Sequence, residues 1–231
     1  MKNAPFSNKF QLKFYCSRVG RKYASYCNKL ENIFDNKKDK KICGCSLVKY
    51  VPSLYRESKG ATGSESTHYY FLNQIFNGAD FNEKHNFIDI GCGKGRVLAF
   101  LTLKNANWNI NGIELNHDVA SFAKNWTDKY DNITIIEGDA FECDYSKYDI
   151  LSLGRPFETQ AFIKFVSKIE NEITHPIMLY YWWDSQSGDY LNNRPGWTLQ
   201  TRGWFFKRGL IPAYKYPQRF SVWKFEPVFN D

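Results

Sequence analysis

The sequence predicts an α/β fold in which a mostly parallel sheet of seven strands ends in an antiparallel pair, and a basic helical segment precedes the sheet. Three observations carry this prediction. Strand-like and helix-like runs alternate from residue 86 onward, a glycine-rich loop follows the first of these strands, and the last two strand-like runs have no helix between them. Short strand–helix periods of this kind require parallel strands with right-handed crossovers.

Five predicted strands alternate with amphipathic helices. The strands are expected at 86–90, 108–115, 133–140, 148–154 and 176–183. The helices, which carry apolar residues at helical spacing, are expected at 96–105, 117–130 and 158–173. Two further apolar runs, 197–206 and 219–227, are joined only by a loop, which predicts an antiparallel pair at the C-terminal edge of the sheet.

The basic charge of the chain is concentrated in its first quarter. The net charge is +7 overall, but residues 1–60 hold 14 Lys/Arg and 4 Asp/Glu, so this segment alone carries 14 − 4 = +10. We therefore divide the chain into a basic, mainly helical segment, 1–60, and a domain formed by 61–231. Such a charge suits a solvated helix face, or an arm for an anionic partner such as RNA, a phosphorylated glycan carrier or a membrane surface.

The pattern inside that segment predicts one amphipathic helix over 18–34, followed by a charged loop over 35–41. The helix prediction depends on an apolar stripe formed by Val19, Tyr23, Tyr26, Leu30, Ile33 and Phe34. The Gly- and Ser-rich stretch 58–67 indicates a boundary, and a second helix is expected directly after it.

No apolar run approaches the roughly 18–20 residues that a membrane span needs, and the basic N-terminus lacks the apolar core of a signal peptide. Six cysteines without regular pairing fit a reducing compartment, so we expect a cytoplasmic protein. No metal site is predicted, because the cysteines nearest the N-terminus lack the spacing of a zinc knuckle: Cys16, Cys27, Cys43 and Cys45.

The stretch DIGCGKG, residues 89–95, places an acid at the end of a predicted strand and three glycines on alternate positions after it. A P-loop needs four residues between its first Gly and Gly-Lys-Ser/Thr, and a dinucleotide fingerprint needs G-x-G-x-x-G, so neither motif fits. An acid at this place would also repel a pyrophosphate. The stretch resembles motif I of the class I S-adenosylmethionine-dependent methyltransferases, (D/E)-x-G-x-G-x-G.

This resemblance implies a Rossmann-like class I methyltransferase fold with S-adenosylmethionine as cofactor. The resemblance implies that Asp89 takes the cofactor's ammonium group, Glu114 the ribose hydroxyls and Asp139 the adenine amino group. Each acid lies near the end of a different predicted strand. The complete set of expected cofactor-binding residues is Glu65, Ser66, Thr67, Asp89, Gly91, Cys92, Gly93, Gly95, Glu114, Leu115, Asp139, Ala140 and Gly154.

Residues from about 60 to 231 resemble, more narrowly, bacterial methyltransferases related to the non-SET histone-lysine methyltransferases. Those relatives carry a loop resembling Y-G-E-T that reaches over the cofactor. The stretch GSEST, with Glu65, Ser66 and Thr67, is the expected counterpart here. A helix N-cap is the alternative role for Ser66 or Thr67.

The acceptor is expected near LGRPF, residues 153–157, at the end of the fourth strand. Enzymes that methylate planar nitrogens carry Asn/Asp-Pro-Pro-Tyr or a similar run there, and relatives of this family often show Asn-Pro-Phe. The chain has Gly154 and Arg155 instead, which argues against methylation of a base or amide nitrogen. Arg155 can hold a carboxylate or phosphate of the acceptor, or pair with the nearby Glu158.

An oxygen acceptor usually needs a general base, and His68 and Asp184 are the two candidates. Aromatic residues at 180–183 and 204–206 suit a sugar ring or an unpaired base near the acceptor. We therefore expect methyl transfer to a small-molecule or glycan-like acceptor, at oxygen. The alternatives are a nucleic acid held by residues 1–60, a protein lysine, or a cofactor-binding scaffold without turnover.

Overall fold

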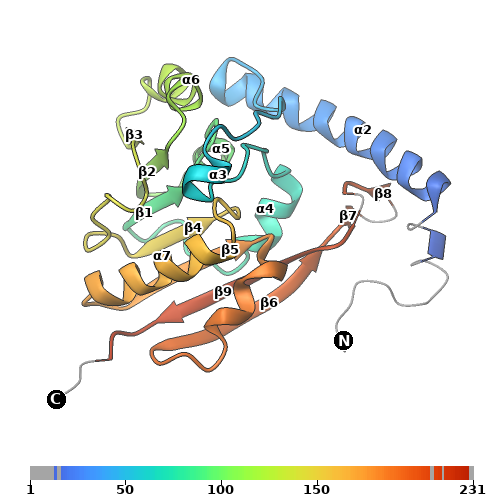
Figure 1. Cartoon of the computed structure of the whole chain (residues 1–231). Coiled ribbons are helices and arrows are strands. Elements are labelled where there is room, and N and C mark those ends of the chain that lie inside the picture. The colour runs from blue at the N-terminus through green and yellow to red at the C-terminus, as the bar shows by residue number, and fades with distance from the viewer. Residues whose placement is uncertain (1–12, 15–16, 209–210, 215, 229–231) are drawn as a thin grey trace.

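The computed structural model describes residues 13–14, 17–208, 211–214 and 216–228. Its centre is a seven-stranded sheet with the strand order β3-β2-β1-β4-β5-β9-β6 (Figure 1). The strands are β1 (His85–Ile90), β2 (Trp108–Glu114), β3 (Ile133–Glu137), β4 (Ile150–Leu153), β5 (Ile177–Trp182), β6 (Trp197–Phe205) and β9 (Gln218–Phe225). β1 to β5 are parallel, whereas β9 runs antiparallel between β5 and β6. The predicted fold class is confirmed, including the antiparallel C-terminal pair.

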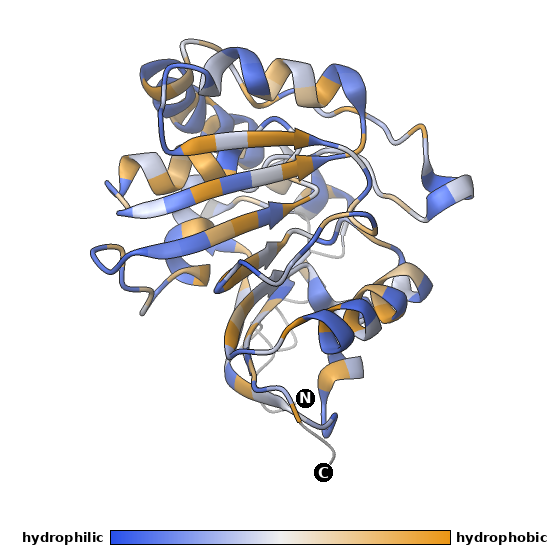
Figure 2. Ribbon diagram, turned by 90° about the vertical axis from the view of Figure 1, so that its left-hand side faces the viewer, coloured by the Kyte–Doolittle hydropathy of each residue, from blue (hydrophilic) through white to orange (hydrophobic). Residues whose placement is uncertain are grey.

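Helices cover both faces of this sheet (Figures 1 and 2). α4 (Tyr69–Ile75), α5 (Arg96–Leu103) and α6 (His117–Thr127) share one apolar cluster, and α7 (Thr159–Glu172) belongs to another. Neighbouring strand residues go to opposite clusters: Phe87 of β1 packs in the first, and Ile88 in the second. This alternation buries β1 on both sides.

The order of the strands reverses between β1 and β4, which lie side by side although two other strands separate them in the chain. The loops that follow β1 and β4 therefore leave the sheet next to each other, with helices on opposite faces. In open parallel sheets this point leaves a crevice outside the carboxyl ends of the strands. It is the place where a ligand site is expected.

The N-terminal helix α2 spans Arg18–Cys43, so it is longer than the sequence pattern suggested. It begins at Ser17, whose side chain accepts a hydrogen bond from the Gly20 amide at 3.0 Å, and it ends at Gly44 in the left-handed conformation. The predicted charged loop over 35–41 is wrong, since these residues continue the helix.

The buried face of α2 also differs from its apolar stripe. Glu31, Asp35 and Asp39 are at most 5% exposed, and they follow Ala24 and Cys27 along one side of the helix. Large apolar side chains of the stripe point away from the core instead: Val19, Tyr26, Ile33 and Phe34 are 69%, 62%, 54% and 54% exposed. Both sets recur at helical spacing, so the spacing alone did not show which set faces inward.

α2 runs along the outside of the fold, from the small hairpin of β7 (Lys207–Arg208) and β8 (Ile211–Pro212) to α5 (Figure 1). The buried acids of α2 pair with both of these elements. Glu31 pairs with Arg208 of β7 at 3.3 Å, and Asp35 and Asp39 pair with Arg96 of α5. Within residues 17–208 there are also three short helices: α3 (Arg56–Lys59), η1 (Asp184–Gln186) and η2 (Gly188–Leu191).

Candidate functional site

A cavity lies at the carboxyl ends of β1, β2 and β4, with about 1080 Å³ of space including its open mouth. Its wall brings together twelve of the residues that the sequence analysis selected. They are Glu65, Ser66, Thr67, Asp89, Gly91, Cys92, Gly93, Glu114, Leu115, Asp139, Ala140 and Gly154. Segments far apart in the sequence thus form one wall, as expected for loops that follow neighbouring parallel strands.

The glycine loop passes close to other parts of the chain. A Cβ on Gly91 would lie 2.5 Å from the Pro156 side chain, and the φ of Gly91 is +69°. Gly95, the one selected glycine outside the cavity wall, has φ +87° and packs against Trp126, whose ring a Cβ would meet at 2.8 Å. Gly95 therefore lets α5 begin directly behind the loop, and it does not line the cavity.

Asp89 stands at the end of β1 and is only 3% exposed. Its carboxylate accepts a hydrogen bond from the Ser152 hydroxyl at 2.6 Å. Burial raises the pKa of Asp89 to about 7, which the Ser152 bond partly offsets and the neighbouring Glu114 adds to. A cation placed in this cavity would favour the ionised form of Asp89.

Glu114, at the end of β2, fixes the shape of the glycine loop. Its carboxylate accepts from the Gly93 amide and from the Asn116 amide, each at 2.9 Å. Burial raises the pKa of Glu114, and these amide bonds oppose the rise. An acid so placed can also accept from hydroxyl groups of a ligand in the cavity.

Asp139 is held by a lysine that the sequence analysis did not select. Lys59, from α3, pairs with its carboxylate at 2.5 Å, and the Phe141 amide donates to the other oxygen at 3.0 Å. Partial burial raises the pKa of Asp139, but these two hydrogen bonds together outweigh burial and hold the pKa below its usual value. A ligand that needs this carboxylate competes with Lys59.

Comparisons with known proteins concern the domain that surrounds this cavity. Residues 81–175 match a family model described as a methyltransferase domain. The chain carries a class I S-adenosylmethionine-dependent methyltransferase domain. Its cofactor is accordingly S-adenosylmethionine. The match spans β1 to α7, the part of the fold that forms most of the cavity wall.

Solved methyltransferase structures share the fold at low sequence identity. An RNA methyltransferase from Salinibacter ruber, in complex with S-adenosyl-L-homocysteine, is 16% identical with a TM-score of 0.51, covering 72% of this chain and 97% of that one. A methyltransferase from Pyrococcus furiosus is 11% identical with a TM-score of 0.56, covering 87% and 98%. The comparison with curated proteins gave no match.

The loop GSEST, 63–67, lines the same cavity as Gly154, which follows β4. The Thr67 hydroxyl accepts from the Trp182 indole at 2.9 Å, and the Ser66 hydroxyl donates to the Leu47 carbonyl at 2.7 Å. Neither caps α4, whose N-cap is His68 without a side-chain bond. Glu65 is exposed and makes no side-chain bond of this kind to the described residues, so its carboxylate is open to a ligand.

A second hollow of about 570 Å³ adjoins the first at Glu65 and Gly154, which line both. Arg155 lies in it with φ +53°, and its guanidinium stands 5.8 Å from the centre of the Trp183 ring. The predicted alternative partner of Arg155, Glu158, is taken by Arg56 at 2.7 Å. Arg155 is thus placed beside the cavity and not in an ion pair with Glu158.

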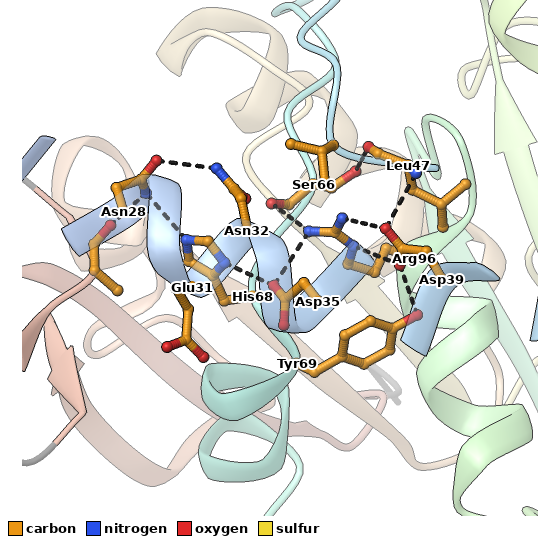
Figure 3. Close-up of polar contacts among 12 residues, drawn as sticks. Asn28, Glu31, Asn32, Asp35, Asp39, Leu47, Ser66, His68, Tyr69 and Arg96 are labelled. Carbon is orange, nitrogen blue, oxygen red and sulfur yellow. Dashed lines mark hydrogen bonds and ion pairs between the residues drawn. The ribbon is translucent and has the colours of Figure 1, made fainter. Parts of the chain in front are cut away.

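His68 lies in a buried polar cluster outside both hollows (Figure 3). It is 2% exposed; Nδ1 lies 2.7 Å from the Asp35 carboxylate and Nε2 lies 3.0 Å from the Asn28 amide. Both ring nitrogens are occupied by α2. The structure therefore does not bring His68 to the acceptor side of the cavity.

Arg96 completes that cluster. Its guanidinium donates to Asp39 at 2.6 Å, contacts Asp35 at 3.5 Å and donates to the Ser66 carbonyl at 3.3 Å (Figure 3). Arg96 is the first residue of α5 and also lines the cavity. It connects α2, the glycine loop and the GSEST loop, a role that spacing could not indicate because its partners are 57 and 61 residues away.

Asp184 is fully buried behind β5, in η1. It pairs with Arg219 at 2.5 Å and accepts from the Ser221 hydroxyl at 2.5 Å. Burial raises the pKa of Asp184, and the hydrogen bonds from Ser221 and Arg219 oppose that rise. Asp184 lines neither hollow. Its contacts with Arg219 and Ser221 connect η1 to β9.

Lys94 of the glycine loop, which the sequence pattern did not single out, donates a hydrogen bond to the Lys49 carbonyl, and burial lowers the pKa of Lys94 to about 8.

The described cysteines are free thiols: Cys27, Cys43, Cys45, Cys92 and Cys143. Cys16 lies outside the described residues. No group of three metal-ligating side chains occurs in the described part of the chain. No described helix has both the length and the apolar content to cross a bilayer.

Proposed function

We propose that the chain transfers a methyl group from S-adenosylmethionine to oxygen of a small-molecule or glycan-like acceptor that bears an acidic group. The observation that carries this proposal is the second hollow, where Arg155 and Trp183 stand next to the cofactor cavity. A guanidinium binds carboxylate or phosphate, and an indole stacks on a flat or sugar ring. The two hollows meet at Gly154 and Glu65, where donor and acceptor would face each other.

In the first hollow we assign the cofactor as follows. Asp89 binds the ammonium group directly or through water, and the bare backbone at Gly91 and Gly93 passes beneath the amino-acid end. Glu114 accepts from the ribose hydroxyls. Asp139 accepts from the adenine amino group once Lys59 has moved aside. The supporting facts are that the three acids lie at or just beyond the carboxyl ends of β1, β2 and β3 and share one wall.

Methyl transfer from a sulfonium is an in-line displacement, in which the methyl carbon–sulfur bond breaks as the carbon–oxygen bond forms. The leaving group is neutral, so alignment of donor and acceptor supplies most of the catalysis. The acceptor hydroxyl also loses a proton. Glu65 is the carboxylate that lines both hollows, whereas His68 and Asp184 line neither, so we propose Glu65 as the general base.

Two observations favour oxygen over nitrogen. No Asn or Asp follows β4, where Gly154 instead leaves room for the Trp182 indole, which a Cβ would meet at 3.0 Å. The carbonyl of Arg155 is taken by the Thr62 hydroxyl at 2.7 Å. None of the described residues that line the second hollow carries a side-chain amide that could orient a planar amino group.

The first test measures cofactor binding separately from turnover of an acceptor. Calorimetric titration with S-adenosylmethionine and S-adenosylhomocysteine, beside NAD, should show micromolar affinity for the first two only. Release of S-adenosylhomocysteine is then measured over a panel of uronic acids, sugar phosphates, the matching neutral sugars and an RNA oligonucleotide. Acidic sugars should be turned over best.

Arg155→Gln should raise KM for the acidic acceptor roughly tenfold or more, while the affinity for S-adenosylhomocysteine stays unchanged. Arg56→Gln, at the rim of the same hollow but paired with Glu158, is the matched control and should change KM less. Equal turnover of neutral and acidic sugars would contradict the acceptor class. Turnover of RNA alone would favour a nucleic-acid acceptor.

Methylation of a protein lysine and a scaffold role both stay predictions. The relation to the non-SET histone-lysine methyltransferases rests on resemblance, and neither the Salinibacter nor the Pyrococcus protein is described as such an enzyme. A scaffold without turnover would bind S-adenosylhomocysteine and leave every member of the panel unchanged.

A further inference from the structure

The outward face of α2 carries only positive charge. All three acids of the helix, Glu31, Asp35 and Asp39, are buried. All of its basic residues are exposed: Arg18, Arg21, Lys22, Lys29, Lys37, Lys38, Lys40 and Lys41. The fold thus removes the negative charge from this surface and leaves the positive charge on it.

The same face carries exposed apolar side chains. Val19, Tyr26 and Ile33 recur every seven residues, and Phe34 follows; we call these four residues the outer stripe. Each is more than half exposed. Apolar residues scattered singly on a surface are ordinary, but an aligned row with basic residues beside it marks a binding surface.

We propose that this face of α2 docks on an anionic lipid surface. A helix with an apolar row flanked by Lys and Arg lies in the membrane interface, where the apolar side chains enter the headgroup boundary and the cations meet anionic headgroups. α2 has 26 residues and is roughly 39 Å long, and the outer stripe, from Val19 to Phe34, extends over roughly 24 Å of it. The contact is peripheral.

Charge and side-chain chemistry decide between this occupant and two others. A second copy of the chain would set one basic face against another, and the repulsion opposes such a dimer. Single-stranded nucleic acid would satisfy the lysines and could stack on Tyr26 or Phe34, but it offers nothing to the aliphatic Val19 and Ile33. A lipid surface takes both kinds of side chain.

The attachment of α2 fits this role. The buried pairs of Asp35 and Asp39 with Arg96 hold the helix against α5, so the outer stripe is presented without any loss of internal contacts. A chain that docks through α2 would hold its methyltransferase cavity near the membrane. The inference does not depend on the identity of the acceptor, because docking requires no methyl transfer.

The test is co-sedimentation of the full chain with vesicles of phosphatidylcholine, with or without about one third phosphatidylglycerol. Binding should be at least tenfold stronger to the anionic vesicles, and should weaken with rising salt. The combined substitution Lys29→Gln, Lys37→Gln and Lys40→Gln should reduce that binding at least tenfold. A matched triple substitution at exposed lysines elsewhere, Lys84→Gln, Lys147→Gln and Lys164→Gln, should leave it nearly unchanged.

A second variant separates docking from plain charge attraction. Ile33→Ser with Phe34→Ser keeps every charge and should still weaken vesicle binding severalfold, with an unchanged circular dichroism spectrum. Full binding by this variant would overturn the proposal. An equal effect of both lysine triples, or an RNA oligonucleotide bound more tightly than anionic vesicles, would overturn it as well.

Discussion

The carboxyl group of Asp89 lies between the cavity, where we propose that it meets the cofactor's ammonium group, and an interior that disfavours charge. Its raised pKa, about 7 against an ordinary 3.8, means that the cofactor-free native chain binds a proton that the unfolded chain releases. The free energy of unfolding should therefore fall as pH rises from about 4 to about 7. The ammonium group of the cofactor favours the ionised carboxylate, so binding should follow the opposite trend.

We expect the affinity for S-adenosylhomocysteine to fall as pH drops below about 7, approaching tenfold per pH unit at low pH. Isothermal titration calorimetry between pH 5.5 and 8 measures this dependence. Asp89→Asn is the control, since it should bind weakly and lose most of the pH dependence. A flat profile in the unmodified chain would contradict the contact between Asp89 and the ammonium group.

Lys59 offers a second test at the residue scale. Because it occupies the carboxylate proposed to bind adenine, Lys59→Ala should tighten binding of S-adenosylhomocysteine, by about two- to fivefold for an exposed pair. Asp139→Asn should weaken binding in either background. Weaker binding by Lys59→Ala would mean that the lysine contacts the ligand and does not compete with it.

At the scale of the element, the charges that α2 buries determine which face of the helix packs against the domain. Arg96→Ala leaves Asp35 and Asp39 buried without their cation, so it should cost about 3–5 kcal/mol of the free energy of unfolding. Arg56→Ala removes an exposed pair and should cost less than about 1 kcal/mol. Urea denaturation measures both.

A combined variant checks the cause. Asp35→Asn with Asp39→Asn should recover part of the stability lost in Arg96→Ala, because the uncompensated charges are then gone. If the two asparagines lower stability further instead, the cost of losing Arg96 comes from packing and not from charge.

α2 also shows how much of the structure could be predicted from the sequence. Two sets of residues follow the helical period, and hydrophobicity selects the wrong set because the buried face contains acids. Those acids are buried against distant partners: Arg208 for Glu31, and Arg96 for Asp35 and Asp39, which His68 and Tyr69 also contact. Nothing near the acids in the sequence indicates these partners. The residues that line the cavity were easier to predict: Asp89, Glu114 and Asp139 lie at or just beyond the carboxyl ends of three neighbouring parallel strands, and those ends must meet.

The acceptor side could not be predicted in the same way. The second hollow is built from Tyr50, Arg56 and Trp183, which come from loops and a short helix with no periodic pattern. Arg155 was found because it replaces an expected amide at the end of a strand. The placement of His68 and Asp184 depended on distant partners, Asp35 and Arg219, that only the fold reveals.

At the scale of the whole molecule, the division at residue 60 is a proposal from composition. The sheet lies entirely within 61–231, but Arg96, His68 and Arg208 all lose α2 partners when residues 1–60 are removed. A 61–231 fragment should therefore melt well below the full chain and bind S-adenosylhomocysteine weakly, as differential scanning fluorimetry and calorimetry would show. A fragment with the full melting temperature and affinity would show that α2 is dispensable for the domain.

The cluster around Arg96 limits which substitutions can be fixed during evolution. An arginine buried between two aspartates on another helix cannot be lost singly without stranding two negative charges, whereas loss of one aspartate still leaves the arginine paired with the other. Natural variants that lose Arg96 should thus also lose the charges at positions 35 and 39. A descendant that has shed its N-terminal helix should carry an uncharged residue where this chain has Arg96, which would make that position a marker of the ancestral architecture.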